Sequence, residues 1–345
     1  IFHVIKIHVV MKHQFSAFFV LGNNSCRAIN ILGFDEIEVS KEDTKCKLAE
    51  KWIPKTVVDS ELQVNENDTQ IHIKGREFAY TIDKRTALFT EMKFAGREYL
   101  NHPMELNIWR APTDNDMYIK SEWKKAHYDK AYTRAYTTEV VQGKHGVKIT
   151  SHASVVAETV QKILDVTITW KIEAAGKIDA DIAVTKDDEF PDLPRFGVRM
   201  FLDKKLSAVR YFGMGPQESY CDKHQAASHG LYRADVGDLH EDYIRPQENG
   251  SHYDCEYVEL NNSRYGIVVS AENAFSFNAS YYTQEELEEK THNYELTESD
   301  SVVFCVDYAL NGIGSNSCGP VVLEQYRFDD VLFRFQFTLI PYIKG

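Results

Sequence analysis

Four stretches of the sequence hold the side chains that could carry chemistry. Each combines acidic, amide or hydroxyl residues with glycine or proline, a composition that does not suit the interior of a regular strand. Such side chains could bind a ligand or a metal ion, or they could bond nearby backbone amides in tight turns. The stretches are residues 107–116 (NIWRAPTDND), 211–220 (YFGMGPQESY), 246–252 (PQENGSH) and 311–320 (NGIGSNSCGP).

The first stretch has the most specific pattern. We expect a strand that ends at Arg110, because Pro112 then forces the chain away from a sheet. The short polar side chains of Asp114, Asn115 and Asp116 follow directly. They indicate either a loop that holds a ligand or metal, or an Asx-rich turn locked by Arg110. The spacing alone leaves both interpretations open.

Several familiar chemistries lack their motifs in this sequence. Gly213 and Gly215 form a G-x-G pair without the third glycine of a dinucleotide site, and no G-x-S-x-G nucleophile elbow is present. None of the 13 histidines stands in an H-E-x-x-H or H-x-H pattern. The six cysteines form no C-x-x-C pair, so we expect reduced thiols. We therefore predict no catalytic residue and no metal site within this chain.

Length and composition exclude other classes of protein. The chain has 345 residues, 43% of them hydrophobic, which is enough for a full core and excludes disorder as its main state. No apolar run reaches the roughly 18–20 residues needed to cross a bilayer. The 39 basic and 52 acidic residues give a formal net charge of −13, without a basic stretch that could bind phosphates. We therefore expect neither a membrane nor a nucleic acid as partner.

The segments between the polar stretches are typical of strands. Residues 166–172 and 178–184 alternate apolar and polar side chains without a break. More than ten such segments, with no rhythm of alternating strands and helices, predict an all-β fold with a large antiparallel sandwich. We expect separate strands at residues 266–270 and 275–277. Two short helices are expected, over residues 121–128 and 283–290, the second with a capping box from Thr283 to Glu286.

The pattern predicts three parts along the chain. Residues 1–42 contain a few short strands, too few for a stable sandwich, and are expected to be the end of a β-domain. A charged segment at residues 43–58 is expected to be a linker, and residues 59–345 the large sandwich. Because the sequence starts at Ile1 rather than Met, we expect it to be part of a longer protein.

Together and in this order, these motifs resemble the C-terminal region of family 2 β-galactosidases, which is a separate small chain in two-subunit members. Residues 109–116 match the family's W-R-A-P-T-D-N-D signature without a mismatch. Residues 1–42 resemble the end of the immunoglobulin-like domain that precedes this region. The other similar blocks are residues 193–197 (LPRFG), 213–220 (GMGPQESY), 246–250 (PQENG), 275–278 (FSFN) with Tyr282, and 312–320.

The resemblance implies a fold and a missing partner. The implied fold is a β-supersandwich of the galactose-mutarotase type. Retaining β-galactosidases cleave with two carboxylates, and in this family both glutamates lie in an upstream (β/α)₈ barrel. That barrel would also hold a magnesium ion, with sodium as a further candidate. We therefore expect no cofactor in this chain, and no hydrolysis by this chain alone.

The resemblance also assigns candidate site residues. It implies that a segment after the D-N-D motif acts as a lid on the substrate pocket, supported by the motif itself. Better-studied members have Gly where this sequence has Tyr118. Counting along the last strand places Leu339 where the family has a sugar-stacking tryptophan, so we expect the platform to be absent or supplied elsewhere. The lid comprises Asp116, Met117, Tyr118, Ile119, Lys120, Ser121 and Glu122, and its support comprises Trp109, Arg110, Asp114 and Asn115.

Two functions are compatible with the sequence. The first is the non-catalytic C-terminal part of a cytoplasmic, homo-oligomeric β-galactosidase, whose partner is a barrel on the same longer chain or on a large subunit. The second is a stand-alone aldose mutarotase or carbohydrate-binding module. Mutarotase chemistry would need a His acid and a carboxylate base on one concave face. The sequence shows no such pair.

Overall fold

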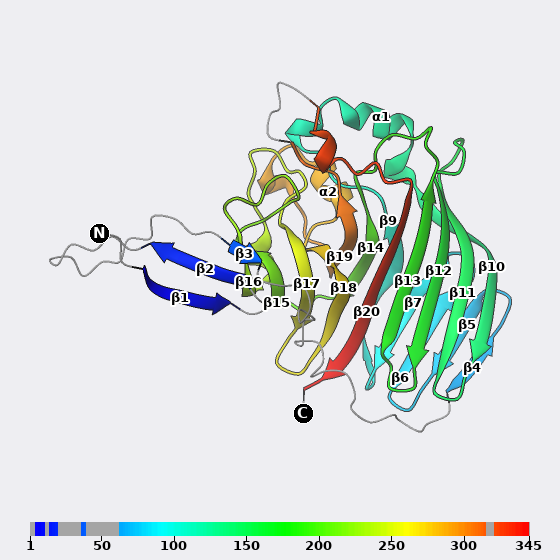
Figure 1. Ribbon diagram of the computed structural model, residues 1–345. Helices are drawn as coiled ribbons and strands as arrows, with labels where there is room; N and C mark the ends of the chain where they lie inside the picture. Colours follow the sequence, from blue (N-terminus) through cyan, green and yellow to red (C-terminus); the bar gives the residue numbers. More distant parts are fainter. Residues whose placement is uncertain (1–3, 11–13, 20–35, 39–61, 315–320, 345) are drawn as a thin grey trace. The chain divides into compact units, whose positions relative to one another are not determined.

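The structure, a computed structural model, describes residues 4–10, 14–19, 36–38, 62–314 and 321–344 (Figure 1). The chain divides into two compact units, Ile1–Glu50 and Lys51–Gly345, and each is described by itself. The predicted linker at residues 43–58 lies outside the described residues.

The first unit contains a three-stranded antiparallel sheet. Its strands are β1 (Val4–Val10), β2 (Gln14–Phe19) and β3 (Glu36–Glu38), in the order β1-β2-β3. The backbone register pairs Val9 with Phe15. The assignment of residues 1–42 to an immunoglobulin-like domain stays a prediction.

The second unit consists of two antiparallel sheets, which confirms the predicted all-β fold with a large antiparallel sandwich. The smaller sheet has five strands in sequence order: β4 (Gln63–Glu66), β5 (Gln70–Lys74), β6 (Phe78–Asp83), β7 (Leu88–Phe94) and β8 (Arg97–Glu98). The larger sheet has 12 strands. They are β9 (Leu100–Asn107), β10 (Tyr132–Gln142), β11 (Gly146–Val156), β12 (Leu164–Glu173), β13 (Ile178–Lys186), β14 (Arg195–Asp203), β15 (Ala208–Gly215), β16 (Ser228–Asp235), β17 (Ser251–Asn261), β18 (Tyr265–Ser280), β19 (Ser301–Leu310) and β20 (Leu332–Ile343).

The large sheet branches at β18, its longest strand. The main path runs β10-β11-β12-β13-β20-β18-β17-β15-β16. The first half of β18 pairs with β20, so that Tyr265 lies opposite Ile343. The second half pairs instead with β19, so that Ser276 lies opposite Asp307, and β19 continues to β14 and β9. A strand that changes partners in this way lets one sheet turn a corner and enclose a core.

The core lies between the two sheets and follows the alternation of the sequence. Along β12 the apolar side chains are buried and the polar ones face outward. Trp170 of β12 is fully buried and donates its indole N–H to the carbonyl of Ala87, 2.8 Å away. Its ring meets Phe89 of β7 edge-on, with centroids 4.9 Å apart. The Tyr80 hydroxyl donates to the carbonyl of Gly176 at 2.7 Å. These contacts join the five-stranded sheet to the large one.

The structure corrects parts of the predicted element pattern. The strands expected at residues 266–270 and 275–277 are one strand, β18, because the exposed residues between them stay extended. The prediction that a strand ends at Arg110 is wrong, because β9 already ends at Asn107. Strands β10 and β16 were not predicted, because both lie at sheet edges where few side chains are buried.

The predicted helices are present with shifted bounds. They are α1 (Ile119–Lys125) and α2 (Gln284–Glu289). Thr283 is the N-cap of α2, and its hydroxyl accepts the N–H of Glu286 at 3.1 Å. The predicted capping box is therefore only half formed. The Glu286 carboxylate accepts the N–H of Thr297 at 2.8 Å instead of the N–H of Thr283. Short 3₁₀ turns lie at η1 (Asp114–Asp116), η2 (Tyr128–Lys130), η3 (Val236–Leu239), η4 (Asn293–Glu295) and η5 (Glu324–Tyr326).

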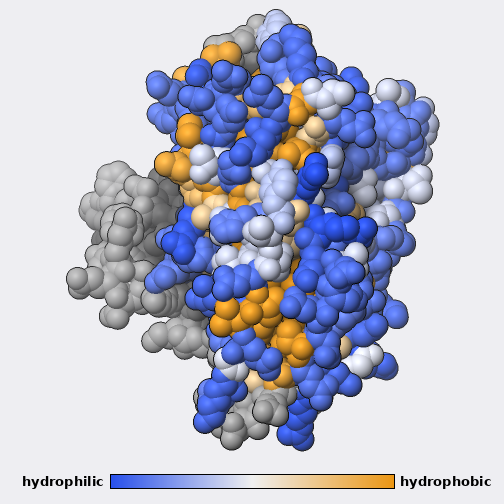
Figure 2. Space-filling model, turned by 90° about the vertical axis from the view of Figure 1, so that its right-hand side faces the viewer, coloured by the Kyte–Doolittle hydropathy of each residue, from blue (hydrophilic) through white to orange (hydrophobic). Residues whose placement is uncertain are grey.

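The surface is mainly polar. Figure 2 shows one face on which hydrophilic residues predominate and apolar residues gather in smaller areas. Within the described residues, no helix has the length and apolar character needed to span a membrane.

Candidate functional site

The four polar stretches of the sequence meet in the second unit. The Arg110 guanidinium donates to the carbonyls of Asn311 and Gly312, at 2.5 and 3.1 Å. The side chain of Gln247 accepts the N–H of Asp114 at 3.0 Å. The third connection is the N–H of Glu248, which donates to the carbonyl of Ala111 at 3.0 Å. We call residues 107–122, 213–223, 245–252 and 311–314, which contain most of the described part of these stretches together with adjoining residues, the loop cluster.

The loop cluster begins where β9 ends. The Asn107 side chain accepts the N–H of Trp109 at 3.1 Å and forms an Asx turn. This turn redirects the chain before Pro112, which cannot donate to a sheet. Trp109 is buried against Trp123 of α1, with ring centroids 6.2 Å apart, and its indole N–H donates to Glu288 of α2 at 3.2 Å. The motif therefore links both helices to the end of the sandwich.

A buried ion pair closes the motif. Arg110 and Asp116 are 0% and 2% exposed, and the guanidinium donates to both carboxylate oxygens, at 2.7 and 3.2 Å. One of these oxygens also accepts the N–H of Thr113 at 2.9 Å. Burial lowers the pKa of Arg110, but the charge of Asp116, the hydrogen bonds to Asp116 and the charge of Glu248 together raise it by more, so the guanidinium stays charged. Of the two interpretations left open by the sequence, the contacts show the Asx-rich turn locked by Arg110.

The other predicted support residues bind neighbouring loops. Asp114 accepts a hydrogen bond from the Gln247 amide at 3.3 Å in addition to the backbone contact above. Asn115 donates to the carbonyl of Gly314 at 2.8 Å. The motif is thus fastened on two sides, to residues 245–252 and to residues 311–314.

The predicted lid follows this anchor and is largely exposed. The side chains of Met117 and Tyr118 are 44% and 64% exposed. Ile119 and Lys120 are half-buried at the start of α1, whereas Ser121 and Glu122 are exposed. Trp123, which follows them, is fully buried, and its indole N–H donates to the carbonyl of Asp192 at 2.8 Å. The exposed segment thus lies between two buried anchors, and its role as a lid stays a prediction. Its contact with a substrate stays a prediction.

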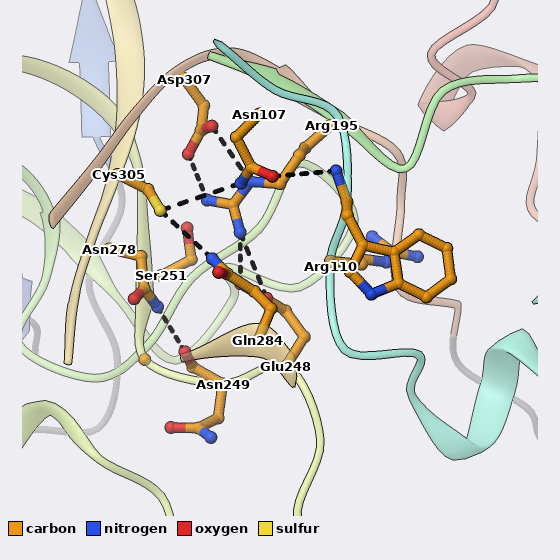
Figure 3. Close-up of polar contacts among 12 residues, drawn as sticks. Asn107, Arg110, Arg195, Glu248, Asn249, Ser251, Asn278, Gln284, Cys305 and Asp307 are labelled. Atoms are coloured by element: carbon orange, nitrogen blue, oxygen red, sulfur yellow. Dashed lines mark hydrogen bonds and ion pairs between the residues drawn. The ribbon is translucent and has the colours of Figure 1, made fainter. Parts of the chain in front are cut away.

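A second buried ion cluster was not predicted from the sequence. It joins Arg195, at the start of β14, to Asp307 of β19 and to Glu248 (Figure 3). Arg195 donates to both oxygens of Asp307, at 3.1 and 2.5 Å, and to Glu248 at 3.3 and 3.4 Å. Arg195 and Asp307 are 0% exposed and Glu248 is 4% exposed. Burial lowers the pKa of Arg195, but the surrounding negative groups, Asp307 foremost, and the hydrogen bonds to Asp307 together raise it by more, so the cluster keeps its cation.

The sequence contained a weak signal for this cluster. Arg195 lies in the LPRFG block and Glu248 in the PQENG block, and Asp307 ends an apolar run. A charge at the end of a buried strand needs a partner. The sequence does not say which residue supplies that partner.

Polar side chains around the ion cluster complete its packing (Figure 3). The Gln284 amide of α2 donates to the Cys305 sulfur at 3.2 Å. Burial raises the pKa of the Cys305 thiol to about 11, so this thiol is protonated and inert at neutral pH. Cys221, Cys255 and Cys305 are free thiols, as predicted, while Cys26, Cys46 and Cys318 lie outside the described residues.

The PQENG block is shaped by its glycine. Gly250 has a φ of +69°, and a Cβ there would lie 2.3 Å from the carbonyl oxygen of Leu239. Its N–H donates to the Glu218 carboxylate of the second polar stretch at 2.8 Å. The neighbouring carbonyl of Asn249 accepts the side-chain amide of Asn278 at 2.5 Å. Only glycine fits this position without strain, which explains the glycine of this block.

Leu339, the predicted position of a sugar platform, lies in the core. It is 0% exposed on β20, between Ile178 of β13 and Val269 of β18. A residue buried between two strands cannot stack on a sugar. Leu339 therefore offers no platform, and the expectation that the platform is absent or supplied elsewhere stays a prediction.

His252, at the end of the third polar stretch, is a buried neutral base. Its ring lies between Tyr211 and Phe277, with centroids 4.4 and 5.1 Å away, and its Nδ1 is 3.2 Å from the carbonyl of Met214. Burial lowers the pKa of His252 from 6.5 to about 4. The imidazole is therefore neutral in the folded chain at any pH above about 4.

This burial predicts a pH-dependent stability. The unfolded chain takes up a proton at His252 as the pH falls below about 6.5, whereas the folded chain does so only near pH 4. The free energy of unfolding should therefore fall across this window, by roughly 3 kcal/mol from His252 at most. Urea unfolding at pH 7, 6, 5 and 4 measures this loss.

Substitution of His252 checks the origin of the effect. His252→Phe should flatten the pH dependence between pH 6.5 and 4, and His152→Gln, at an exposed histidine, should leave it unchanged. An unaltered slope in the His252→Phe variant would contradict the assignment.

The loop cluster acts as a scaffold. The carboxylates of Asp116, Glu248 and Asp307 are all engaged by arginine guanidinium groups. Within residues 62–314 and 321–344, no group of three or more His, Cys, Asp or Glu side chains could hold a metal ion. The buried charges of this cluster hold the turn that precedes residues 117–122 and the described residues 311–314.

Comparison with known proteins identifies the family. Residues 74–339, which include the loop cluster, match the family described as the β-galactosidase small chain. A β-galactosidase of Actinobacillus pleuropneumoniae is 44% identical over 310 residues, which are 90% of this chain and 30% of that protein. A β-galactosidase of Staphylococcus xylosus is 34% identical over 282 residues, 81% of this chain and 28% of that protein.

Among solved structures, a galactose 1-epimerase from Lactobacillus acidophilus NCFM aligns with a TM-score of 0.44 at 8% identity, covering 83% of this chain and 99% of that one. This alignment is too weak to support an inference about function. The chain spans about 30% of the length of the curated relatives above. The family match extends over most of the chain, and the chain belongs to the β-galactosidase small-chain family.

Proposed function

We propose that this chain is the non-catalytic C-terminal part of a β-galactosidase that hydrolyses terminal β-D-galactosides such as lactose. The observation that carries the proposal is the 44% identity over 310 residues to a β-galactosidase of which these residues form only 30%. The remaining part of such a protein has room for a catalytic barrel. In the proposed enzyme, that barrel lies on the same longer chain or on a large subunit.

The division of labour follows from the chemistry. Glycoside hydrolysis by retention needs two carboxyl groups about 5–5.5 Å apart, one as acid/base and one as nucleophile. The buried carboxylates of Asp116, Glu248 and Asp307 are unsuited to these roles, because each is held by an arginine. We assign the acid/base and the nucleophile to the barrel.

This chain's own residues would position one wall of the substrate pocket. Arg110 and Asp116 hold the start of the segment 117–122, and Trp123 holds its end. The exposed Met117 and Tyr118 would then contact the sugar or the barrel. Such a segment excludes water from the reacting bond when it closes. A displacement of about 1 Å can already cost much of the rate, and the buried ion pairs limit how far this segment can move.

Metal ions belong to the barrel in this proposal. The described residues here do not fit a magnesium site, because no cluster of three or more potential ligands is present among them. No step assigned to this chain passes through magnesium or sodium. A cytoplasmic location and a homo-oligomeric assembly complete the proposed setting.

Reconstitution tests the proposal. The isolated 345-residue chain should hydrolyse neither lactose nor o-nitrophenyl galactoside, and activity should appear when a barrel-containing β-galactosidase fragment that lacks this region is added. An equal concentration of an unrelated protein serves as control. Hydrolysis by the isolated chain above a buffer blank, or no gain on mixing two folded partners that bind each other, would refute the proposal.

The alternative of a stand-alone mutarotase has its own measurement. Polarimetry of freshly dissolved α-D-galactose reports anomerisation directly. We expect the chain to leave the uncatalysed rate unchanged, and a faster approach to equilibrium would favour the alternative.

A further inference from the structure

A cavity of about 320 Å³ opens in the second unit beside the branch of the large sheet. Its walls come from β17, β18 and β19 and from residues 325–330, which lead into β20. This volume is at the lower end of the range typical of small-molecule sites, about 300–1,000 Å³. None of the residues predicted as lid or lid support lines it.

Aromatic side chains dominate one part of the lining. Neighbouring rings hold several of them in place. Tyr308 stacks on Phe333, with centroids 4.8 Å apart, and His224 stacks on Tyr253 at 5.7 Å. The N–H of Phe328 donates to the Asn311 side chain at 2.9 Å and fixes the segment that carries this ring. The aromatic lining residues are Tyr220, Tyr253, Phe275, Tyr308, Tyr326 and Phe328.

Polar groups of both kinds complete the lining. Asp254 and Asp330 supply carboxylates that accept hydrogen bonds, Arg327 donates, and Gln325 and Ser276 can do both. The two carboxylates come from different elements, since Asp254 belongs to β17 and Asp330 follows η5.

Asp254 has an unusual backbone. Its φ of +53° lies in the left-handed region, which costs energy for most residues other than glycine. The carbonyl of Asp254 lies 3.0 Å from Nε2 of His229, a contact that helps to hold this conformation.

We propose that this cavity binds the pyranose ring of a neutral sugar. The C–H face of a pyranose suits the electron-rich face of an aromatic ring. Each sugar hydroxyl both donates and accepts, which matches a lining that offers carboxylates beside an arginine, a glutamine and a serine. An anion would be repelled by two carboxylates, and an organic cation would leave the donors without partners. The proposed site adds a sugar-binding function to this chain that is independent of hydrolysis by the barrel.

Saturation-transfer NMR on the full 345-residue chain tests this site with D-galactose as the probe. We expect binding with a Kd on the order of 1–10 mM, as is usual for a ligand of about 12 heavy atoms. Asp330→Asn should weaken binding by about tenfold or more, because a hydrogen bond to a charged acceptor is lost. Asp330 is exposed, so the substitution should not disturb the fold.

The chain offers a matched control one residue away. Asp329 is also exposed but does not line the cavity, so Asp329→Asn should bind galactose as the unsubstituted chain does. Asp254→Asn tests the second carboxylate, and asparagine tolerates the left-handed backbone there. Thermal unfolding confirms that each variant is folded. The site would be refuted by absent transfer in the folded chain, by equal binding in Asp330→Asn, or by transfer to choline or acetate but not to galactose.

Discussion

Replacing Arg195 by alanine should lower the free energy of unfolding by about 3–5 kcal/mol. The guanidinium is fully buried and neutralises two carboxylates, Asp307 and Glu248, which are themselves almost fully buried. Without it, both carboxylates would stay in the interior without a cation, and leaving charges there unpaired is among the most costly single changes. Because domains are stable by only about 5–15 kcal/mol, the variant should be close to its unfolding threshold.

Urea unfolding followed by tryptophan fluorescence measures this loss. The matched control is Arg334→Ala, which removes a guanidinium from an equally close bidentate pair with Asp181 on the surface. The Arg334 side chain is 62% exposed, so its loss should cost no more than about 1 kcal/mol. If both variants lost a similar free energy of unfolding, burial of the Arg195 cluster would not be the reason for the loss.

A double-mutant cycle separates pairing from packing. If Arg195 and Asp307 act as a unit, the variant that carries both alanine substitutions should be much less destabilised than the sum of the single variants. An additive result would mean that Arg195 contributes through its packing alone.

The strands of the large sheet could be predicted from the sequence where the alternation of apolar and polar residues matches the alternation of buried and exposed side chains. β12 and β13 alternate strictly and are buried on one side, so their sequences show their structure directly. β18 does not, because the four residues between its halves are largely exposed and resemble a loop in composition. Its change of partner from β20 to β19 depends on strands that lie far away in the chain. Local pattern contains no information about such a change.

The candidate site divides in the same way. The ion pair of Arg110 with Asp116 spans six positions of one motif, and the sequence already indicated a turn locked by the arginine. Arg195 and Asp307 are 112 positions apart, and only the pairing of β14 with β19 brings them together. The burial of Leu339 also depends on its neighbours in β13 and β18, which counting along β20 cannot show.

The two ion clusters together explain why one end of the sandwich can hold a defined loop arrangement. Glu248 binds Arg195 through its side chain, while its backbone N–H binds Ala111 of the first motif. The strands β14 and β19 are therefore connected through one residue to the segment that begins the predicted lid. Arg195 and Arg110 should therefore be energetically coupled through Glu248.

Replacing Arg110 by alanine should release the segment 113–125 while the sandwich persists. The guanidinium holds Asp116 and the carbonyls of Asn311 and Gly312, and no other described contact closes this turn as tightly. Loss of a buried pair costs about 3–5 kcal/mol, so local opening should become at least about 100-fold more frequent. Hydrogen exchange of the amides in residues 113–125 should accelerate accordingly, and exchange in β12 and β13 should not.

Two further variants decide whether the fork geometry matters. Arg110→Lys keeps the charge but not the planar pair of donors, and should recover only part of the protection. Lys125→Ala removes an exposed partner of Glu122 in the same helix and should leave exchange unchanged.

In the reconstituted β-galactosidase, Arg110→Ala should lower kcat/KM by about 100-fold if the segment forms a pocket wall, since ångström-scale displacement has that cost. Faster exchange without a change in kcat/KM would show that Arg110 orders this segment but that the segment does not serve the reaction.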